Sequence, residues 1–497
     1  MDSNRVISIG VVLLCAASLS SCGSDSTAPG PNGLSIAGGA GQSDTVLSTL
    51  PKPLIMRLQE PGTRSGQIVN FFSLPIDIQG YANAYVHRVG GAGTYTFLFD
   101  STDLNGRAAV QVVFGTQAGP VPIIVEAPVF NLVDTVWFTV RPGSAAAVVA
   151  APEDTALFVG ATLTLHTRVV DRFGNARTDP VAYSVLHGPA TIADSVVTGT
   201  AVGRAAILAS AGGKSDTTYL SVVPQGVLAA GAADGLHVFH LDGSAMQQMI
   251  IEGSIGALRW SPSGTALVYD QTTSGQTLGT DLIQTVTLSG TTTVVDQTPA
   301  DRDIWPQWSR DGGTIFYSKL SFGSSALWAA TPTGYEDDSL PNQNPSFDLF
   351  PSPSPDATQL VYVADLGTTA DLRILTRATG AVRDLNTVGW APVWAPTGQT
   401  IAYISQFNNY GPIALINADG TGQRQLAAGP YNQDLDWSPD EQWIVAQNTT
   451  TTQIDLINVA TGAAVPLPYT TGFWSPAWQP TSGSGAGARV RHARPSP

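Results

Sequence analysis

LRWSPSG, at residues 258–264, is the segment that decides the fold, because it returns five more times along the rest of the chain. Each of the first five copies is followed by a short β-branched or aromatic run, such as ALVY at 266–269, which predicts a strand after a tight turn. The later copies are PQWSRDG (306–312), PSPSPD (351–356), PVWAPTG (392–398), LDWSPD (435–440) and PAWQP (476–480).

One position in each copy, called the marker here, is Trp in every copy except the third. The markers are Trp260, Trp308, Pro353, Trp394, Trp437 and Trp478, with spacings of 48, 45, 41, 43 and 41 residues. A period of about 44 residues matches one four-stranded blade of a β-propeller. Pro and Gly suit the tight turn, and we expect each Trp to pack between neighbouring blades.

The strands that are missing at the end of this region are found at its beginning. No strands follow the sixth marker, whereas two strand-like runs, 227–230 and 236–241, precede the first one. We therefore expect the last strand to complete the first blade, which closes six blades without an open edge. With its six copies in register, 225–480 resembles the TolB-like, WD40-like propeller family. That resemblance implies a docking platform for envelope proteins.

Short alternating apolar runs between Gly, Pro, Asn and Asp turns predict two β-sandwiches ahead of the propeller. GQSDTV (41–46) and DLNGRA (103–108) make residues 34–142 resemble the group 1, invasin/intimin-type bacterial Ig-like domain, although QEPG (59–62) replaces its usual Asp-x-x-Gly-Asn turn. DRFGN (171–175) and GRAAILA (203–209) make residues 143–224 similar to the group 2 domain. The resemblance implies spacers, with adhesive surfaces as the alternative. The expected fold class is all-β: two Ig-like sandwiches, then a six-bladed propeller.

The N-terminal residues predict export. Arg5 precedes an apolar stretch of 14 residues, 6–19, which suits a secretory signal but is too short to span a bilayer. LSSC, at residues 19–22, resembles the lipobox of bacterial lipoproteins, which implies cleavage of a signal peptide, residues 1–21, and lipid attachment to Cys22. An ordinary signal peptide with a chance cysteine is the alternative. Residues 22–33 predict a flexible tether, and we expect the protein at the outer membrane or cell surface.

Charge and cysteine usage exclude several functions. The net charge is -15 with only three lysines, so the chain has no electrostatic footprint for nucleic acid. Both cysteines lie in the first 22 residues, so the folded body has no disulfide, no thiol nucleophile and no Cys-ligated zinc. The composition of residues 481–497 predicts a disordered tail. The tail carries a basic cluster, and the alternative is that this cluster contacts acidic lipid or the acidic body of the protein.

Catalytic motifs are absent from the sequence. The chain has no Gly-x-Ser-x-Gly elbow with an accompanying α/β domain. His237 and His240, the only close histidine pair, are three apart on a predicted strand, so they face opposite ways and cannot share a metal ion. We therefore expect no catalytic residue, no metal and no cofactor.

Four aromatic residues just upstream of the markers form the candidate ligand site. If the innermost strands line a channel, these side chains from different blades rim one mouth and grip a peptide or a sugar. The alternative is that they belong to the core between blades. They are Trp305, Phe350, Trp390 and Trp474.

Together these patterns predict a non-enzymatic, lipid-anchored envelope or cell-surface protein. The Ig-like stalk would present a propeller that binds another protein or an envelope polysaccharide, with the membrane as a second partner through the lipid. We expect a monomer. Two alternatives stay open: an adhesin in which the Ig-like domains bind, and an enzyme of unknown reaction with its site on a propeller face.

Overall fold

The computed structural model describes most of the chain downstream of the predicted tether. The described residues are 33–59, 65–73, 81–250, 254–272, 281–296, 301–321, 323–334, 336–337, 340, 347–406 and 410–480. The predicted signal peptide, Cys22, the tether up to residue 32, most of the 59–62 turn and the basic tail lie outside these residues.

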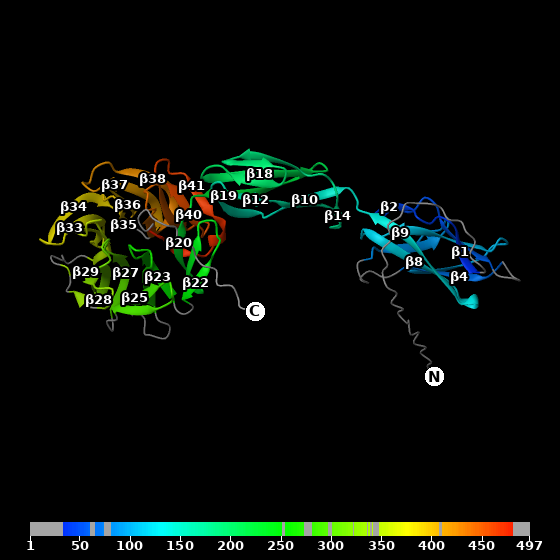
Figure 1. Ribbon diagram of the computed structural model, residues 1–497, viewed down its shortest axis with the longest axis horizontal. Helices are drawn as coiled ribbons and strands as arrows, with labels where there is room; N and C mark the ends of the chain where they lie inside the picture. Colours follow the sequence, from blue (N-terminus) through cyan, green and yellow to red (C-terminus); the bar gives the residue numbers. More distant parts are fainter. Residues whose placement is uncertain are drawn as a thin grey trace, which may run out of the picture. The chain divides into compact units, whose positions relative to one another are not determined.

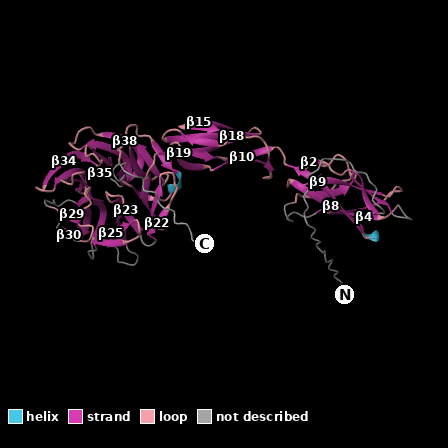
Figure 2. Cartoon of the chain, viewed as in Figure 1, coloured by secondary structure: helices cyan, strands magenta, loops and turns pink. Residues whose placement is uncertain are grey.

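Strands make up nearly all of the regular structure (Figure 2). In the described ranges the two helical segments are single 3₁₀ turns, Pro128–Phe130 and Pro468–Thr470. No helix in the described part of the chain is long and apolar enough to cross a membrane. The prediction of an all-β fold is confirmed.

The chain divides into two compact units. The first comprises residues up to Ser144 together with Asp171–Ala176, and the second comprises Ala145–Val170 and the residues from Arg177 onward. The first unit is a β-sandwich of two sheets, with strand orders β1-β3-β7-β5 and β2-β9-β8-β4-β6. Its strands are β1 (Gly33–Gly38), β2 (Ser43–Thr45), β3 (Leu54–Gln59), β4 (Ile68–Ser73), β5 (Ala84–Arg88), β6 (Phe97–Ser101), β7 (Arg107–Phe114), β8 (Gly119–Ala127) and β9 (Leu132–Arg141).

Alternation along these strands builds the core of the first sandwich. In β3 every second residue, Leu54, Met56 and Leu58, is buried, and β7 follows the same period of two. Phe71 and Phe114, both fully buried, belong to the same core. The opposite face of the β2-β9-β8-β4-β6 sheet is more exposed.

The second unit begins with ten short strands in three sheets, ordered β10-β13-β14, β11-β19-β18-β15 and β12-β17-β16. The longest pairing among them is the β18/β19 hairpin, whose turn contains Gly212 and Gly213 at positive φ. The strands of these three sheets are β10 (Ala145–Ala151), β11 (Asp154–Phe158), β12 (Thr162–Thr164), β13 (His166–Asp171), β14 (Ala176–Arg177), β15 (Ala182–His187), β16 (Ala190–Ala193), β17 (Val196–Gly199), β18 (Gly203–Ala211) and β19 (Lys214–Val223).

The rest of the second unit is the propeller, in which six blades can be followed through the described residues (Figure 1). Blades 1, 2 and 3 are successive groups of four strands in chain order. They are β23 (Ser254–Trp260), β24 (Ala266–Thr272), β25 (Asp281–Thr287), β26 (Thr292–Asp296); β27 (Arg302–Trp308), β28 (Ile315–Ser321), β29 (Ser324–Ala330), β30 (Glu336–Asp337); β31 (Phe347–Pro353), β32 (Gln359–Asp365), β33 (Ala370–Thr376) and β34 (Ala381–Val388).

Blades 4 and 5 share one long strand. The first half of β38 pairs with β37 and its second half pairs with β39, so this strand is outermost in blade 4 and innermost in blade 5. The strands of these blades are β35 (Trp390–Trp394), β36 (Thr400–Ile404), β37 (Tyr410–Asn417), β38 (Arg424–Trp437), β39 (Trp443–Asn448), β40 (Ile454–Asn458) and β41 (Ala464–Leu467).

The closing blade joins the two ends of the propeller. Its strand order is β22-β21-β20-β42, with bounds β20 (Val227–Ala232), β21 (Gly235–His240), β22 (Gln247–Ile250) and β42 (Trp474–Trp478). Leu228 pairs with Trp478 and Ala229 with Ala477. The last strand therefore completes the blade that the first strands begin, as the positions of the strand-like runs predict.

Candidate functional site

All six markers occupy the same place in the fold: each is the last residue of the innermost strand of its blade. Four of the marker tryptophans are only 5 to 7% exposed, because their rings pack between blades. The Trp260 indole donates a hydrogen bond to the carbonyl of Ala477 in the closing blade (3.2 Å), and Trp437 donates to Val393 in blade 4 (3.2 Å). The inter-blade packing expected from the sequence is confirmed.

Short side-chain hydrogen bonds stabilise the turns that follow the markers. The Ser309 hydroxyl donates to Asp311 at 2.6 Å, and Ser354 and Ser438 make the same contact with the acidic residue two positions later. Gly312, at φ 73°, supplies the left-handed conformation that the turn requires. Turns of this kind therefore lie around one end of the propeller axis.

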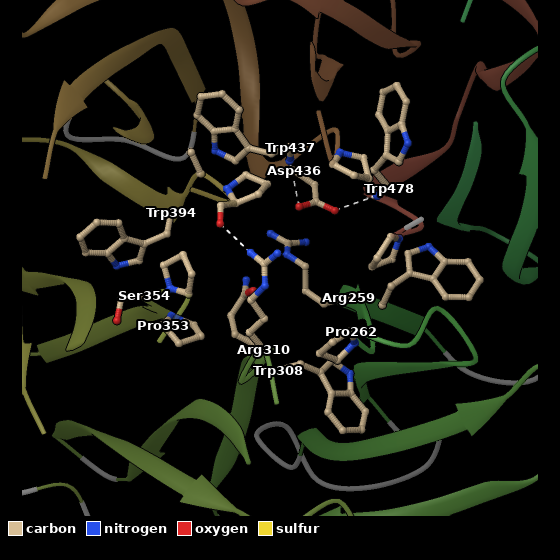
Figure 3. A pocket seen from close by; sticks show the side chains of 17 residues that line it. Arg259, Pro262, Trp308, Arg310, Pro353, Ser354, Trp394, Asp436, Trp437 and Trp478 are labelled. Carbon is tan, nitrogen blue, oxygen red and sulfur yellow. Dashed lines mark hydrogen bonds between the residues drawn. The ribbon is translucent and has the colours of Figure 1, made fainter. Parts of the chain in front are cut away.

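A cavity of about 330 Å³ opens between these turns, and we call it the funnel (Figure 3). Its wall is the ring of six markers, and above it lies a second ring, the turn ring, two residues after each marker. The turn ring is Pro262, Arg310, Pro355, Pro396, Pro439 and Pro480. The volume falls within the range of about 300–1,000 Å³ typical of ligand pockets.

Polar side chains form the floor of the funnel. Arg259 and Gln307 line it and also line a second cavity further along the axis, so they separate the two. The Arg259 guanidinium donates to the carbonyls of Leu258 (2.7 Å) and Leu435 (2.9 Å), which lie in different blades. Asp436 accepts hydrogen bonds from the backbone amides of Trp437 (2.9 Å) and Trp478 (2.7 Å).

Three carboxyl groups near the axis have raised pKa values. Burial raises the pKa of Asp434 and of Asp436, and the positive charge of Arg259 opposes that rise. Burial, together with the negative charges of Asp434 and Asp281, raises the pKa of Asp270 to about 8. Asp270 still accepts hydrogen bonds from the amides of Ala257 (2.8 Å) and Trp305 (3.3 Å).

The raised pKa of Asp270 makes propeller stability depend on pH. In the unfolded chain its carboxyl titrates near 3.8, so between pH 4 and about 8 the unfolded state binds fewer protons. The free energy of unfolding therefore falls as pH rises, by up to about 1.4 kcal/mol per pH unit from this one group. Asp270→Asn keeps the acceptor oxygen and should flatten the decline. Urea unfolding of the wild-type chain and the variant at pH 5 and pH 8, monitored by tryptophan fluorescence, measures this decline. An equal decline in the two proteins would contradict the assignment of the pH dependence to Asp270.

The structure brings three of the four predicted rim aromatics together. Trp305 stacks on Phe350 with ring centroids 3.7 Å apart, and Phe350 meets Trp390 edge-on at 5.2 Å. Trp474 instead donates its indole hydrogen to the carbonyl of Ile255 (2.7 Å). The cavity beside the stack is about 10 Å³, room for one water molecule. Ligand binding by these four residues stays a prediction.

A β-bulge explains why these aromatics meet. All six innermost strands shift register a few residues before the marker, and Trp305 (φ 57°) and Phe350 (φ 54°) lie at that shift in left-handed backbone. A bulge re-aims the side chain it carries, so these rings turn toward each other. The alternation read from the sequence assumes regular strands and does not reveal this.

Sequence reasoning identified the six markers but not the other residues that line the funnel. Arg310 is aligned with proline in every other copy, which is the one signal that could have singled it out. Arg259 and Asp436 precede their markers by one residue, in strands that read as ordinary apolar runs. Among the described residues no group of three or more His, Cys, Asp or Glu is placed to hold a metal ion.

A closed six-bladed propeller with an open cavity at one end of its axis is the class of protein that this fold defines. The model of the TolB β-propeller domain family matches residues 227–482, more than half of the chain, and the chain belongs to this family. The resemblance drawn from the six copies is thereby confirmed. The lipobox and the two Ig-like assignments stay predictions.

Solved structures similar to the chain share little sequence with it. TolB from Acinetobacter baumannii is 16% identical over 56% of this chain and 80% of that one, with a TM-score of 0.46. A chain of the nidogen/laminin complex is 10% identical over 51% of this chain and 98% of that one, with a TM-score of 0.43. No curated protein matches the chain.

Proposed function

We propose that this protein is a non-enzymatic binding protein of the bacterial envelope, in which the propeller captures a segment of another protein in the funnel. The observation that carries the proposal is the funnel itself: an open, rigid cavity walled by tryptophans and prolines in a TolB-family propeller. Such concave sites with a few polar groups at the floor are typical of ligand recognition. Cys22 would anchor the chain through lipid, and the sandwiches would act as spacers.

The polar groups of the funnel floor favour binding over catalysis. Asp436 and Arg259 are engaged in hydrogen bonds to backbone groups of their own and of other blades, so their role in holding the blades together is accounted for. A general acid or base must be within reach of a substrate proton. Asp434, which accepts a hydrogen bond from Ser475 at 2.6 Å, is buried beneath them.

One observation favours the adhesin alternative. The outer face of the first sandwich exposes Phe97, Phe99 and Trp137, which are 45, 47 and 48% accessible. Phe97 and Phe72 are in contact at 4.8 Å on neighbouring strands. Large exposed aromatics on one sheet are a feature of interaction surfaces, so this face is included in the test.

Site-specific photo-crosslinking of the full chain in its native envelope tests the proposal. A photoreactive residue replaces Pro355 in the turn ring, and a matched control replaces Thr461, an exposed residue in the turn before β41. We expect a discrete protein adduct at Pro355 and none at Thr461. Equal labelling at both positions would contradict the funnel as the binding site. An adduct only from a third probe at Phe99 would favour the adhesin.

A further inference from the structure

The turn ring contains one exception to its pattern. Five of its six members are half-buried prolines, and the sixth, Arg310 in blade 2, is an exposed arginine. Proline gives a rigid apolar lip without hydrogen-bond donors, since its nitrogen carries no hydrogen. Arg310 therefore places the only side chain of the turn ring that can donate hydrogen bonds at the entrance of the funnel.

Arg310 reaches across the entrance. Its Nη1 donates to the carbonyl of Pro396, in the turn of blade 4, at 2.6 Å (Figure 3). A guanidinium has five N–H donors, and this is its one hydrogen bond to the described residues. The remaining donors of an exposed, permanently charged group are thus available to a ligand in the funnel.

A second positive charge lies in the same cavity. Arg259 contributes its guanidinium from the floor, and Figure 3 shows both guanidinium groups in the middle of the cavity. The one acidic side chain among the residues that line the funnel is Asp436, whose carboxylate already accepts two backbone amides. In a chain of net charge -15, the residues that line the funnel thus carry two positive groups and one acidic group, and two like charges in one cavity favour an anion between them.

We propose that Arg310 determines the specificity of the funnel by binding a side-chain carboxylate of an acidic segment of the partner protein. This rests on the proposed function. The guanidinium exchanges the neutral carbonyl of Pro396 for a carboxylate, a stronger, charge-assisted and bidentate acceptor. The prolines of the turn ring pack against the aliphatic part of the acidic side chain, and the positive charge of Arg259 at the floor adds to the attraction.

Two synthetic peptides test this proposal with the full chain. The probes are acetylated, amidated tetraglutamate and tetraglutamine, titrated at low ionic strength and followed by calorimetry. We expect the acidic peptide to bind at least about tenfold more tightly, and Arg310→Gln to remove about tenfold of that preference. Higher salt should weaken the binding of tetraglutamate and leave the binding of tetraglutamine unchanged.

A matched control separates the funnel from general surface charge. Arg383 is also exposed and donates through Nη2 to a backbone carbonyl, that of Ala418, at 2.6 Å, but it does not line the funnel. Arg383→Gln should keep the full preference for tetraglutamate. Both variants replace exposed side chains, so we expect wild-type thermal unfolding, which verifies that each is folded.

Several results would overturn the proposal: equal binding of the two peptides, no binding of either, or a preference that survives Arg310→Gln. The crosslink at Pro355 distinguishes these failures from a failure of the proposed function. If the crosslink forms while the acid preference is absent, the funnel binds a partner by other chemistry. If no adduct forms at Pro355, the proposed function itself fails.

Discussion

A chain truncated after Gly472 is expected to lose the cooperative unfolding transition of its propeller. The truncation removes β42, so β20 loses its antiparallel partner and the closing blade loses its innermost strand. Trp478 is 6% exposed and Ala477 fully buried, each in a different core cluster. Removal of a core tryptophan alone costs about 3–5 kcal/mol, and an open sheet edge adds to that loss.

Near-ultraviolet circular dichroism and tryptophan fluorescence measure this effect, because ten of the eleven tryptophans lie in the propeller. The matched control is truncation after Pro480, which removes the basic tail and keeps β42. We expect this control to unfold like the full chain. A cooperative transition of unchanged midpoint in the shorter chain would show that closure by β42 does not stabilise the propeller.

The second large effect is expected at a buried ion pair between β28 and β26. Lys319 Nζ lies 2.6 Å from Asp296 Oδ2, and the two side chains are only 5 and 4% exposed. The Tyr317 hydroxyl donates to the same carboxylate at 2.7 Å, and the ammonium lies 4.2 Å from the Trp328 ring centroid. Lys319→Met removes the ammonium group that contacts this buried carboxylate, which should destabilise the propeller by about 3–5 kcal/mol.

Urea unfolding of the full chain at pH 7 measures that change. The double variant Lys319→Met with Asp296→Asn serves as the control, since it removes both charges and should recover part of the stability. Loss of less than about 1 kcal/mol in the single variant would mean that the pair behaves like a surface ion pair. Such a result would contradict the burial of Lys319 and Asp296.

Repetition made most of the fold predictable from the sequence. The marker spacing predicts six blades, and the runs at 227–230 and 236–241 predict the closing blade. Both features depend on local turn chemistry that recurs in register, so they can be read without knowledge of long-range contacts. The substitution of Pro353 for the third tryptophan did not disturb the pattern, because the turn that follows it keeps the same hydrogen bond from Ser354 to Asp356.

The candidate site was less predictable. The four aromatics were placed on the correct strands, yet the bulge in each innermost strand turns Trp305 and Phe350 into a stack with Trp390. Positive φ at a bulky aromatic residue is rare, and the sequence carries no signal for it. The raised pKa of Asp270 is another such case. It results from burial and from the nearby charge of Asp434, a residue that lies in a different blade.

The sequence by itself determined the number of blades, their order, the closure and the acidic character of the chain, because each follows from residue types and their spacing. Only the tertiary structure decided which side chains share the funnel. Arg259 bonds to a carbonyl 176 residues away and Arg310 to one 86 residues away. Six strands converge on one axis, and that convergence, rather than any local motif, places a pair of arginines within a ring of prolines.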